Sequence, residues 1–402
     1  MSKGLIFTGQ PIFSQILSFI DFDIIRKATR QYKSDRYYKK FKTREHLITM
    51  LYCVLHKCTS IREVTTGMQV CYTKLNHLGM RYCPRKSTLS DANKSRNYLV
   101  FETIHQKLYK SLRRSLPDSQ IKNGWFKRLY IVDSSTISLF KAILKTGGRP
   151  AMSGRKKGGI KVHAMIKADE DVPCFVRLTA AASHDVKFIQ GLHLPAGSVI
   201  TFDKGYFDYK QYDLWTAQKV NWVTRLKHTG AYTVIKNKRV SSQNKEKGVL
   251  SDQIIELGYR QRPSNHQTKA RLIIFNDKDT KKQFKFISNN LKFDAFTIAS
   301  IYQQRWQIEL LFKRVKQHFP LQYIIGDNEN AIKIQIYVAL IADLLIKYLK
   351  TRLKRSWSFS NLTSMLRIHL MSYVEIIKFL NNPEKALINI ANIQPRGPTL
   401  FE

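Results

Sequence analysis

Acidic residues are scarce in this sequence, which holds 29 Asp and Glu against 68 Lys and Arg in 402 residues, a formal net charge of +39 at pH 7. Charge of this size and sign attracts polyanions, and nucleic acid is the commonest large polyanion. Long apolar runs are also missing, because the most apolar stretch, residues 334–349, is short for a bilayer and contains Asp343 and Lys347. The sequence therefore argues against a membrane partner and predicts a buried helix at this stretch.

Cysteine is rare as well. The five cysteines are an odd number without the spacing of a disulfide framework, so a reducing cytosol is the simpler inference. The N-terminal residues lack the basic region, apolar run and cleavage site of a secretory signal. We therefore expect a cytoplasmic, nucleoid-associated protein. A zinc site is conceivable but disfavoured, because no C-x2-C pair occurs among Cys53, Cys58, Cys71 and Cys83.

Residues 1–120 are predicted to form a helical DNA-binding domain. Apolar residues recur at helical spacing behind Thr43, which is a good N-cap residue. Ser60 and Glu63 have the spacing of a capping box and predict a second helix. Lys and Arg are denser here than in the rest of the chain, so short capped helices with basic faces suggest a helix-turn-helix module.

A third helix is predicted from Thr88, which stands at capping-box spacing from Asp91. It carries Asn93, Lys94 and Arg96, and these residue types make it a candidate for reading a DNA groove. An ordinary helical bundle with a solvated basic surface fits the same residues, and the sequence leaves both alternatives open.

From Trp125 onward the chain changes to predicted strands. Three β-rich stretches, a short helix and a further strand suggest a mixed α/β sheet, and these lie at residues 128–140, 158–168, 173–181, 185–192 and 198–206. Residues 221–290 contain strand-like pieces between polar, Lys-rich turns and predict a β-rich insertion. The predicted domains are thus 1–120, then 121–220 with 291–330, the insertion at 221–290, and a helical C-terminal region at 331–402.

One carboxylate set among cations marks residues 302–316. At about 100° per residue, one helical face within roughly 80° carries Tyr302, Arg305, Glu309, Lys313 and Lys316. Such a face can hold a divalent metal through its carboxylate and phosphates through its other side chains. The alternative is a solvated helix with an i, i+4 charge ladder, which is worth only a few tenths of a kcal/mol.

Two further carboxylates end or interrupt predicted strands. Asp133 stands within an apolar strand, where an unpaired charge is costly, and Asp203 ends another strand before a glycine turn. Each has a bland explanation: hydrogen bonds to neighbouring serines for Asp133, and turn initiation for Asp203. If both met Glu309 at the sheet edge, the three could hold two Mg²⁺ ions for phosphoryl transfer.

The spacing Tyr302-x2-Arg305-x3-Glu309-x6-Lys316 resembles the Tyr-Arg-Glu-Lys signature of insertion-sequence transposases of the DDE class, and of their insertion-sequence-4-like branch. Asp133 and Asp203 are similar to that family's other two acids, and the segments Lys161-Val-His163 and His184-Asp185 also look like family stretches. The resemblance implies a ribonuclease-H-like α/β fold, as in retroviral integrases, in the catalytic domain.

The resemblance also implies a cut-and-paste DNA transposase that nicks, forms hairpins and transfers strands. Asp133, Asp203 and Glu309 would be catalytic and bind Mg²⁺, with Mn²⁺ as a substitute. Phosphates of double-stranded DNA, at terminal inverted repeats and target, would be held by the Tyr, Arg and Lys residues, and a homodimer would pair the ends. Trp222 and Trp306 are candidates for stacking on a flipped base, although core packing is the simpler role. The alternatives are a transposase-derived DNA-binding protein and a hydrolytic nuclease.

Overall fold

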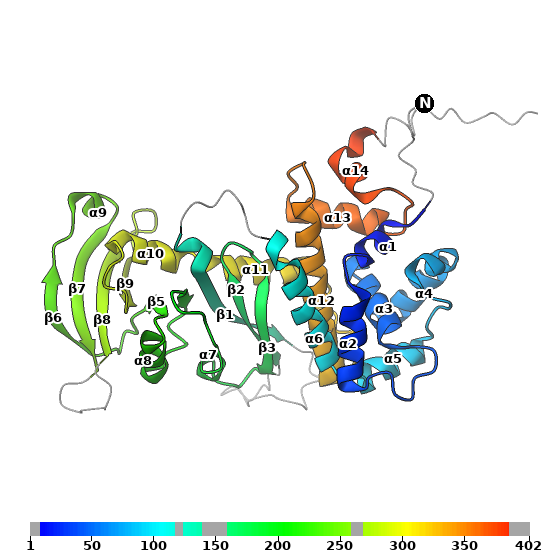
Figure 1. The fold of residues 1–402 in the computed structure, drawn as a ribbon, viewed down its shortest axis with the longest axis horizontal. Coiled ribbons are helices and arrows are strands. Elements are labelled where there is room, and N and C mark those ends of the chain that lie inside the picture. Colours follow the sequence, from blue (N-terminus) through cyan, green and yellow to red (C-terminus); the bar gives the residue numbers. More distant parts are fainter. Residues whose placement is uncertain (1–8, 117–123, 139–158, 259–267, 386–402) are drawn as a thin grey trace, which may run out of the picture. The chain divides into compact units, whose positions relative to one another are not determined.

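The computed structural model describes residues 9–116, 124–138, 159–258 and 268–385. The chain divides into two compact units (Figure 1). One comprises the described parts of Met1–Leu116 and Val315–Glu402, and the other the described parts of Pro117–Arg314. None of the helices in these described ranges is both long and apolar enough to cross a membrane.

The first unit is helical. Its elements are α1 (Ile12–Leu17), α2 (Phe22–Tyr32), α3 (Thr43–His56), α4 (Ile61–Val70), η1 (Tyr72–Leu78), α5 (Lys86–Ser95), α6 (Leu99–Leu112), η2 (Arg113–Ser115), α12 (Glu329–Thr351), α13 (Phe359–His369) and α14 (Ile376–Asn381). The helix predicted at residues 334–349 is the buried centre of α12, which packs on α3, α5 and α6. Asp343 within it is buried.

The predicted helix starts are only partly correct. Ser60 caps α4 by accepting a hydrogen bond from the backbone N–H of Glu63 at 3.2 Å, as predicted. Thr43 is instead the first residue of α3, and its hydroxyl bonds to the Asp35 carboxylate at 2.7 Å. Helix α5 begins at Lys86, two residues before the predicted cap Thr88, and its N-cap residue is Arg85.

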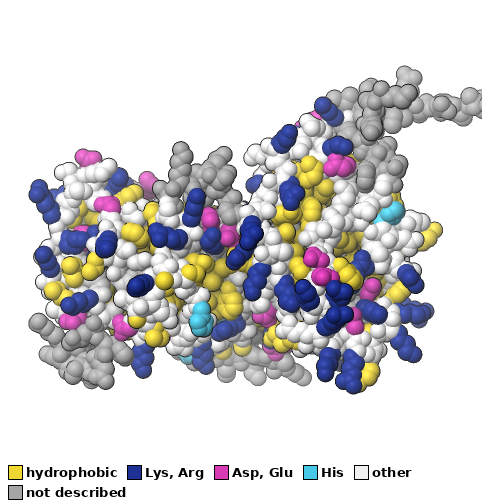
Figure 2. Space-filling model, viewed as in Figure 1, with side chains coloured by type: hydrophobic (Ala, Val, Ile, Leu, Met, Phe, Trp, Pro, Cys, Tyr) yellow, Lys and Arg dark blue, Asp and Glu magenta, His cyan; other side chains and the backbone are white. Residues whose placement is uncertain are grey.

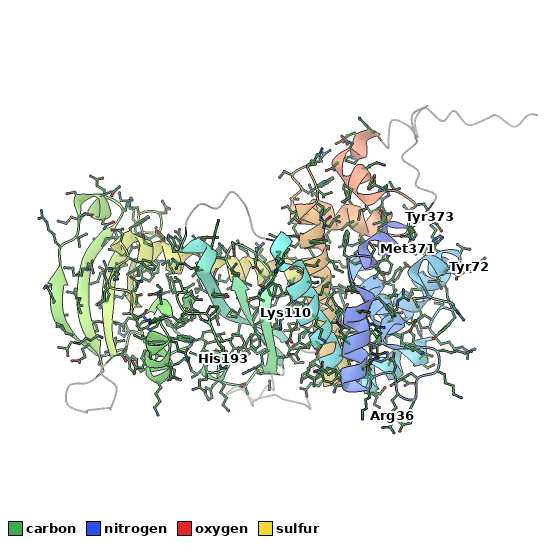
Figure 3. The ribbon with its side chains drawn as sticks, viewed as in Figure 1. Arg36, Tyr72, Lys110, His193, Met371 and Tyr373 are labelled. Carbon is green, nitrogen blue, oxygen red and sulfur yellow. The ribbon has the colours of Figure 1, made fainter. Side chains whose placement is uncertain are left out.

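N-terminal and C-terminal segments pack together in this unit. The Gln15 amide donates to the carbonyl of Val374 at 2.7 Å and accepts from the N–H of Ile376 at 2.9 Å. Lys74 donates to the carbonyl of Met371 at 2.8 Å and lies 5.1 Å from the Tyr373 ring centroid. Met371 and Tyr373 are labelled in Figure 3. The C-terminal helices are therefore part of the same core as the N-terminal ones.

The second unit is built on one nine-stranded sheet with the order β3-β2-β1-β4-β5-β9-β8-β7-β6. The strands are β1 (Leu129–Ser138), β2 (Gly159–Lys167), β3 (Pro173–Ala180), β4 (Val199–Phe202), β5 (Asn221–Arg225), β6 (Tyr232–Lys238), β7 (Val249–Leu257), β8 (Thr268–Asn276) and β9 (Gln283–Ser288). Its helices are η3 (Phe126–Arg128), α7 (Val186–Ile189), α8 (Tyr209–Ala217), α9 (Ser242–Glu246) and α10 (Ala295–Gln303). Helix α11 (Trp306–His318) runs across the boundary between the units.

The sheet is mixed. Strands β1 and β4 and strands β4 and β5 pair in parallel, whereas the other neighbouring pairs are antiparallel. Helices α8 and α10 both pack on β5 and β8. The predicted mixed α/β sheet with helical terminal regions is confirmed. Residues 221–290 supply β5 to β9, so the strands predicted as an insertion continue the same sheet.

Candidate active site

Two of the predicted acids follow paired positions on parallel strands. Val132 of β1 is in register with Phe202 of β4; Asp133 is the next residue of β1, and Asp203 is the first residue after the end of β4. Val132 and Phe202 are both fully buried, so apolar packing fixes this register. The two carboxylates therefore arise at neighbouring positions on one edge of the sheet.

Arg305 joins Asp133 to Glu309. Its Nη1 atom donates to Asp133 Oδ2 at 2.8 Å, and its Nη2 atom donates to Glu309 Oε1 at 2.5 Å. Arg305 lies between α10 and α11, and Glu309 is in the first turn of α11. The side chains of Arg305 and Asp133 are only 17% and 16% exposed, so their ion pair is shielded from water, whereas the Glu309 side chain is 34% exposed. One guanidinium thus brings together two acids that are far apart in the sequence.

Tyr302 connects the same region to Asp203. Its hydroxyl donates to Asp203 Oδ1 at 3.4 Å, and its ring packs on Phe286, with the ring centroids 4.9 Å apart. Burial, mainly, raises the pKa of Tyr302 to about 12, so the hydroxyl is a donor at neutral pH. The backbone N–H of Gly205 supplies a second hydrogen bond to Asp203, at 3.3 Å.

The electrostatics of Asp133 reflect crowding of negative charge. Burial, above all, raises its pKa to about 6, and the nearby charges of Asp203 and Glu309 contribute to this rise. The Ser134 N–H, at 2.7 Å, and the Arg305 guanidinium act in the opposite direction without cancelling this effect. The ionised form of a buried carboxyl group such as Asp133, close to other acids, is stabilised by an additional positive charge.

The three acids do not form a ready-made metal site in this structure. Within the described ranges, no three His, Cys, Asp or Glu side chains are grouped closely enough to hold an ion, so neither the three-carboxylate cluster nor a zinc site is present. The physical reason for the first is that Arg305 already holds Asp133 and Glu309. Hard carboxylate oxygens suit Mg²⁺ or Mn²⁺, and their attraction for a cation is evident in the Arg305 contacts.

Lys313 and Lys316 lie one and two turns after Glu309 in α11. Lys313 is exposed and Lys316 is partly buried, and burial lowers the pKa of Lys316. The unit boundary falls between them, at residue 315. Lys313 therefore continues the charged face of the sheet unit, whereas Lys316 belongs to the helical unit.

The predicted groove readers are placed differently from one another. Asn93 is 1% exposed, accepts a bond from His46 Nε2 at 2.7 Å if that nitrogen is protonated, and donates to the carbonyl of Ile325 at 3.3 Å. Arg96 is also 1% exposed and donates to the carbonyl of Phe41 at 2.8 Å. The prediction that these two side chains read DNA is therefore wrong for this conformation, because both bind their own chain. Lys94 is exposed.

The two tryptophan candidates also separate. Trp222 is fully buried and stacks on Tyr212, with the ring centroids 4.6 Å apart, so its role is core packing. Trp306 is 59% exposed and lines a cavity of about 660 Å³. Many of the other lining residues are aromatic or basic, including Arg225, Lys247, Phe284, Phe286, Phe296 and Tyr302, and two are acidic, Asp277 and Asp279. Sequence reasoning missed this cavity, because its walls come from separate strands and helices without a local motif.

Lys and Arg side chains are spread over the molecular face shown in Figure 2, where Asp and Glu are fewer. Such a surface suits nonspecific contact with phosphates. The charged groups at Asp133, Arg305 and Glu309 differ from this background, because Arg305 pairs with both acids and because Asp133 and Arg305 are largely withdrawn from solvent.

Comparison with known proteins gives two family matches. A family model described as "Transposase DDE domain" matches residues 124–345, and one described as "Domain of unknown function (DUF4372)" matches residues 8–81. The putative transposase y4zB of Sinorhizobium fredii (strain NBRC 101917 / NGR234) is 30% identical over 274 residues, which are 68% of this chain and 73% of that protein.

Two further relatives are described as transposases of insertion sequences. The putative transposase for insertion sequence element IS4SA of Synechocystis sp. is 27% identical over 294 residues, 71% of this chain and 77% of that protein. The probable transposase for IS5377 of Geobacillus stearothermophilus is 29% identical over 235 residues, 58% and 60% of the two chains. A cryo-EM structure of the piggyBac transposase synaptic complex with hairpin DNA aligns with 97% of this chain and 86% of that chain, with a TM-score of 0.42 and 12% identity.

Proposed function

This chain belongs to the family of transposases with a DDE domain, and we propose that it moves its own insertion sequence by cut-and-paste transposition. In this proposal the protein binds the terminal inverted repeats in double-stranded DNA, nicks them, forms hairpins and joins the freed 3′ ends to target DNA. Pairing two ends requires at least two protomers, so a homodimer is the working assembly. The site of action is the cytoplasmic nucleoid.

Asp133, Asp203 and Glu309 are the proposed ligands of Mg²⁺, for which Mn²⁺ would substitute. A bound pair of such ions would activate a water or 3′-hydroxyl and stabilise the leaving oxygen. The observation that carries this assignment is the Arg305 bridge. Asp133 and Glu309 both bind this one guanidinium, although Asp133 lies 172 residues before Arg305 in the sequence. Asp203 follows the adjacent strand and contributes to the negative field at Asp133.

The basic side chains have separate proposed roles. Arg305 would exchange its carboxylate partners for a DNA phosphate, which its planar guanidinium can bind through two donors. Tyr302, Lys313 and Lys316 would hold neighbouring phosphates. Exposed Lys94 in the helical unit remains a candidate backbone contact, in place of the buried Asn93 and Arg96.

Hairpin formation is supported by the aromatic cavity beside Tyr302 and Arg305. Strand distortion in a hairpin unstacks bases, and an unstacked base is stabilised by contact with aromatic rings, at about 1–3 kcal/mol per base. Trp306 lines this cavity and has an exposed ring, whereas Trp222 does not line it and is buried. Trp306→Ala should therefore reduce hairpin yield more than first-strand nicking.

The test is an assay with Mg²⁺, DNA carrying the ends of the element and a target plasmid. Asp203→Ala should reduce strand cleavage by about a thousandfold or more, as expected for loss of several kcal/mol of metal-assisted catalysis, while end binding persists. Glu246→Gln, at an exposed position of α9, is the matched charge control and should cleave normally.

The same assay separates the two alternatives. A transposase-derived binding protein would retain the ends but show no metal-dependent cleavage in wild type. A hydrolytic nuclease would cut in an Asp203-dependent manner but give no product in which pre-cleaved 3′ ends are joined to the plasmid. Joined products that disappear with Asp203→Ala support transposition.

A further inference from the structure

A fourth carboxylate, Asp185, lies beside the proposed catalytic acids and has no role in the scheme above. It precedes α7 and does not cap that helix through its side chain. Instead its Oδ1 atom accepts hydrogen bonds from Ser134 Oγ at 3.2 Å and from Lys161 Nζ at 3.0 Å. The Lys161 ammonium also donates to the carbonyl of Ser183 at 3.2 Å. Asp185 therefore binds both β1 and β2.

The contact with Ser134 leads directly to Asp133. The backbone N–H of Ser134 donates to Asp133 Oδ1 at 2.7 Å, while its hydroxyl is held by Asp185. A residue whose side chain is fixed on one side has less freedom to rotate its backbone on the other. Asp185 thus restrains the hydrogen bond that orients Asp133.

The contact between Asp185 and Lys161 holds the Lys161 ammonium in place. The Lys161 side chain is only 15% exposed, and Asp185 is its acidic partner at 3.0 Å. His163, whose Nδ1 is 3.7 Å from the same Asp185 oxygen, is not a second cation at neutral pH, because burial lowers its pKa to about 4. The charge of Lys161 is therefore the one that Asp185 balances in this contact.

Asp185 also faces Asp203 across Gly205. A Cβ atom placed on Gly205 would lie 3.6 Å from Asp203 Oδ2 and 4.0 Å from Asp185 Oδ2. Lys161, Asp185 and Gly205 line the same cavity, of about 340 Å³. A Lys161 ammonium released from Asp185 would have Asp203 as a nearby alternative partner. Arg305 shows that a cationic side chain in this region does occupy the catalytic acids.

We propose that Asp185 is a positioning residue that orients Asp133 through Ser134 and keeps the Lys161 ammonium away from the acids that bind the divalent ion. This inference rests on the proposed function, because it assumes that Asp133, Asp203 and Glu309 are the metal ligands. It assigns to Asp185 an effect on metal affinity without direct metal contact. A purely structural role in holding β1 to β2 would change folding stability and leave metal affinity unaltered.

The test measures Mn²⁺ binding to the DNA-free full chain by electron paramagnetic resonance. Asp185→Asn should raise the Mn²⁺ dissociation constant about tenfold, since it both frees Lys161 and loosens Ser134. Adding Lys161→Gln to Asp185→Asn should recover most of this loss, because the competing cation is gone. Asp185→Glu should retain more affinity than Asp185→Asn, and Glu246→Gln should match wild type.

An Asp185→Asn protein that binds Mn²⁺ as tightly as wild type overturns the inference, as does a double variant no better than Asp185→Asn. If Asp185→Asn does not fold, Ser134→Ala decides, because it removes the hydroxyl that Asp185 holds: Mn²⁺ binding should weaken, and binding as tight as in wild type contradicts the proposal. Glu309→Gln separates this inference from its premise. If Glu309→Gln leaves Mn²⁺ binding unchanged, the proposed metal site fails, whereas an effect at Glu309 without one at Asp185 removes only the positioning role.

Discussion

Buried charge is treated differently in the two compact units. In the helical unit, Arg96 is enclosed and donates to the carbonyls of Ser34 and Phe41, at 3.4 and 2.8 Å, with Asp35 at 3.9 Å. In the sheet unit, Asp133 is also shielded, and burial above all raises its pKa to about 6, with the charges of Asp203 and Glu309 adding to this effect and its hydrogen-bond donors opposing it. The Arg96 charge is thus stabilised by partners within the chain, whereas ionised Asp133 would be further stabilised by an additional positive charge.

This difference separates residues that build the scaffold from residues that act on a ligand. Residue type did not distinguish Arg96 from Arg305, since both were predicted to contact DNA. Their partners do: Arg96 binds mostly backbone carbonyls, whereas Arg305 binds two carboxylates that we propose as metal ligands. Four predictions test whether this contrast is real.

The largest effect on stability is expected for Arg96→Ala. Removing this buried side chain leaves the Phe41 carbonyl without its donor and opens a cavity, so unfolding should become easier by about 3–5 kcal/mol. Urea denaturation followed by circular dichroism measures the loss. Lys94→Ala, on the same segment but exposed, should change stability by less than about 0.5 kcal/mol. Equal losses of stability in the two variants would contradict the assignment of Arg96 as a structural residue of the helical unit.

A pH effect of somewhat smaller size should come from His46. Burial above all, and the charge of Arg96, lower its pKa from 6.5 to about 3, so the folded chain keeps this ring neutral. The unfolded chain takes up the proton near pH 6.5. The contribution of the neutral His46 ring to the free energy of unfolding is therefore complete above pH 6.5. It is lost as pH falls toward 3, and the total loss is on the order of 4 kcal/mol.

His46→Gln should reduce the slope of protein stability against pH between pH 7 and pH 4. The slope will not vanish, because burial also lowers the pKa of His56 and His105 to about 4 in the same unit. Thermal melts at half-unit pH intervals provide the comparison. An unchanged slope in His46→Gln would show that the buried ring is not a major source of acid sensitivity.

Much of the sheet unit could be predicted from local pattern. Apolar runs ending at Asp133 and Asp203 predict strands, and their parallel register then follows from packing. The Glu309 helix follows from 3.6-residue periodicity. The orientation of Arg305 toward Asp133 could not be predicted, because it depends on where α10 and α11 lie against β1, a tertiary relation without a local signal.

The helical unit was predicted less well at the level of side chains. Capping patterns predicted that helices exist near Thr43 and Thr88 but misplaced both starts. The burial of Asn93 and Arg96 depends on partners such as Ile325 and Phe41, which are distant in the sequence. A polar residue in a basic helix has the same local sequence signature whether it faces DNA or the core.

The Arg305 contacts predict a competition between the guanidinium and a divalent ion. In DNA-free protein, Arg305→Gln should lower the Mn²⁺ dissociation constant about tenfold, or about 1.4 kcal/mol, because Asp133 and Glu309 lose their resident cation. Cleavage of DNA should nevertheless fall, since the proposed phosphate contact is lost too. Electron paramagnetic resonance of Mn²⁺ measures the first change. Weaker Mn²⁺ binding would mean that Arg305 organises the two carboxylates instead of competing for them.

The smallest effect is expected at Lys94, and it sharpens the contrast within α5. Lys94 is exposed, while Asn93 and Arg96 beside it are buried, so only Lys94 is free to contact a phosphate without rearrangement of the helical unit. Loss of one phosphate contact should weaken binding to end DNA and to unrelated DNA alike, and reduce the slope of log affinity against log salt by about 1. Fluorescence anisotropy over a salt series measures both quantities for Lys94→Ala. A loss confined to end DNA would instead indicate base reading by α5, and an unchanged slope would place this helix away from the DNA backbone.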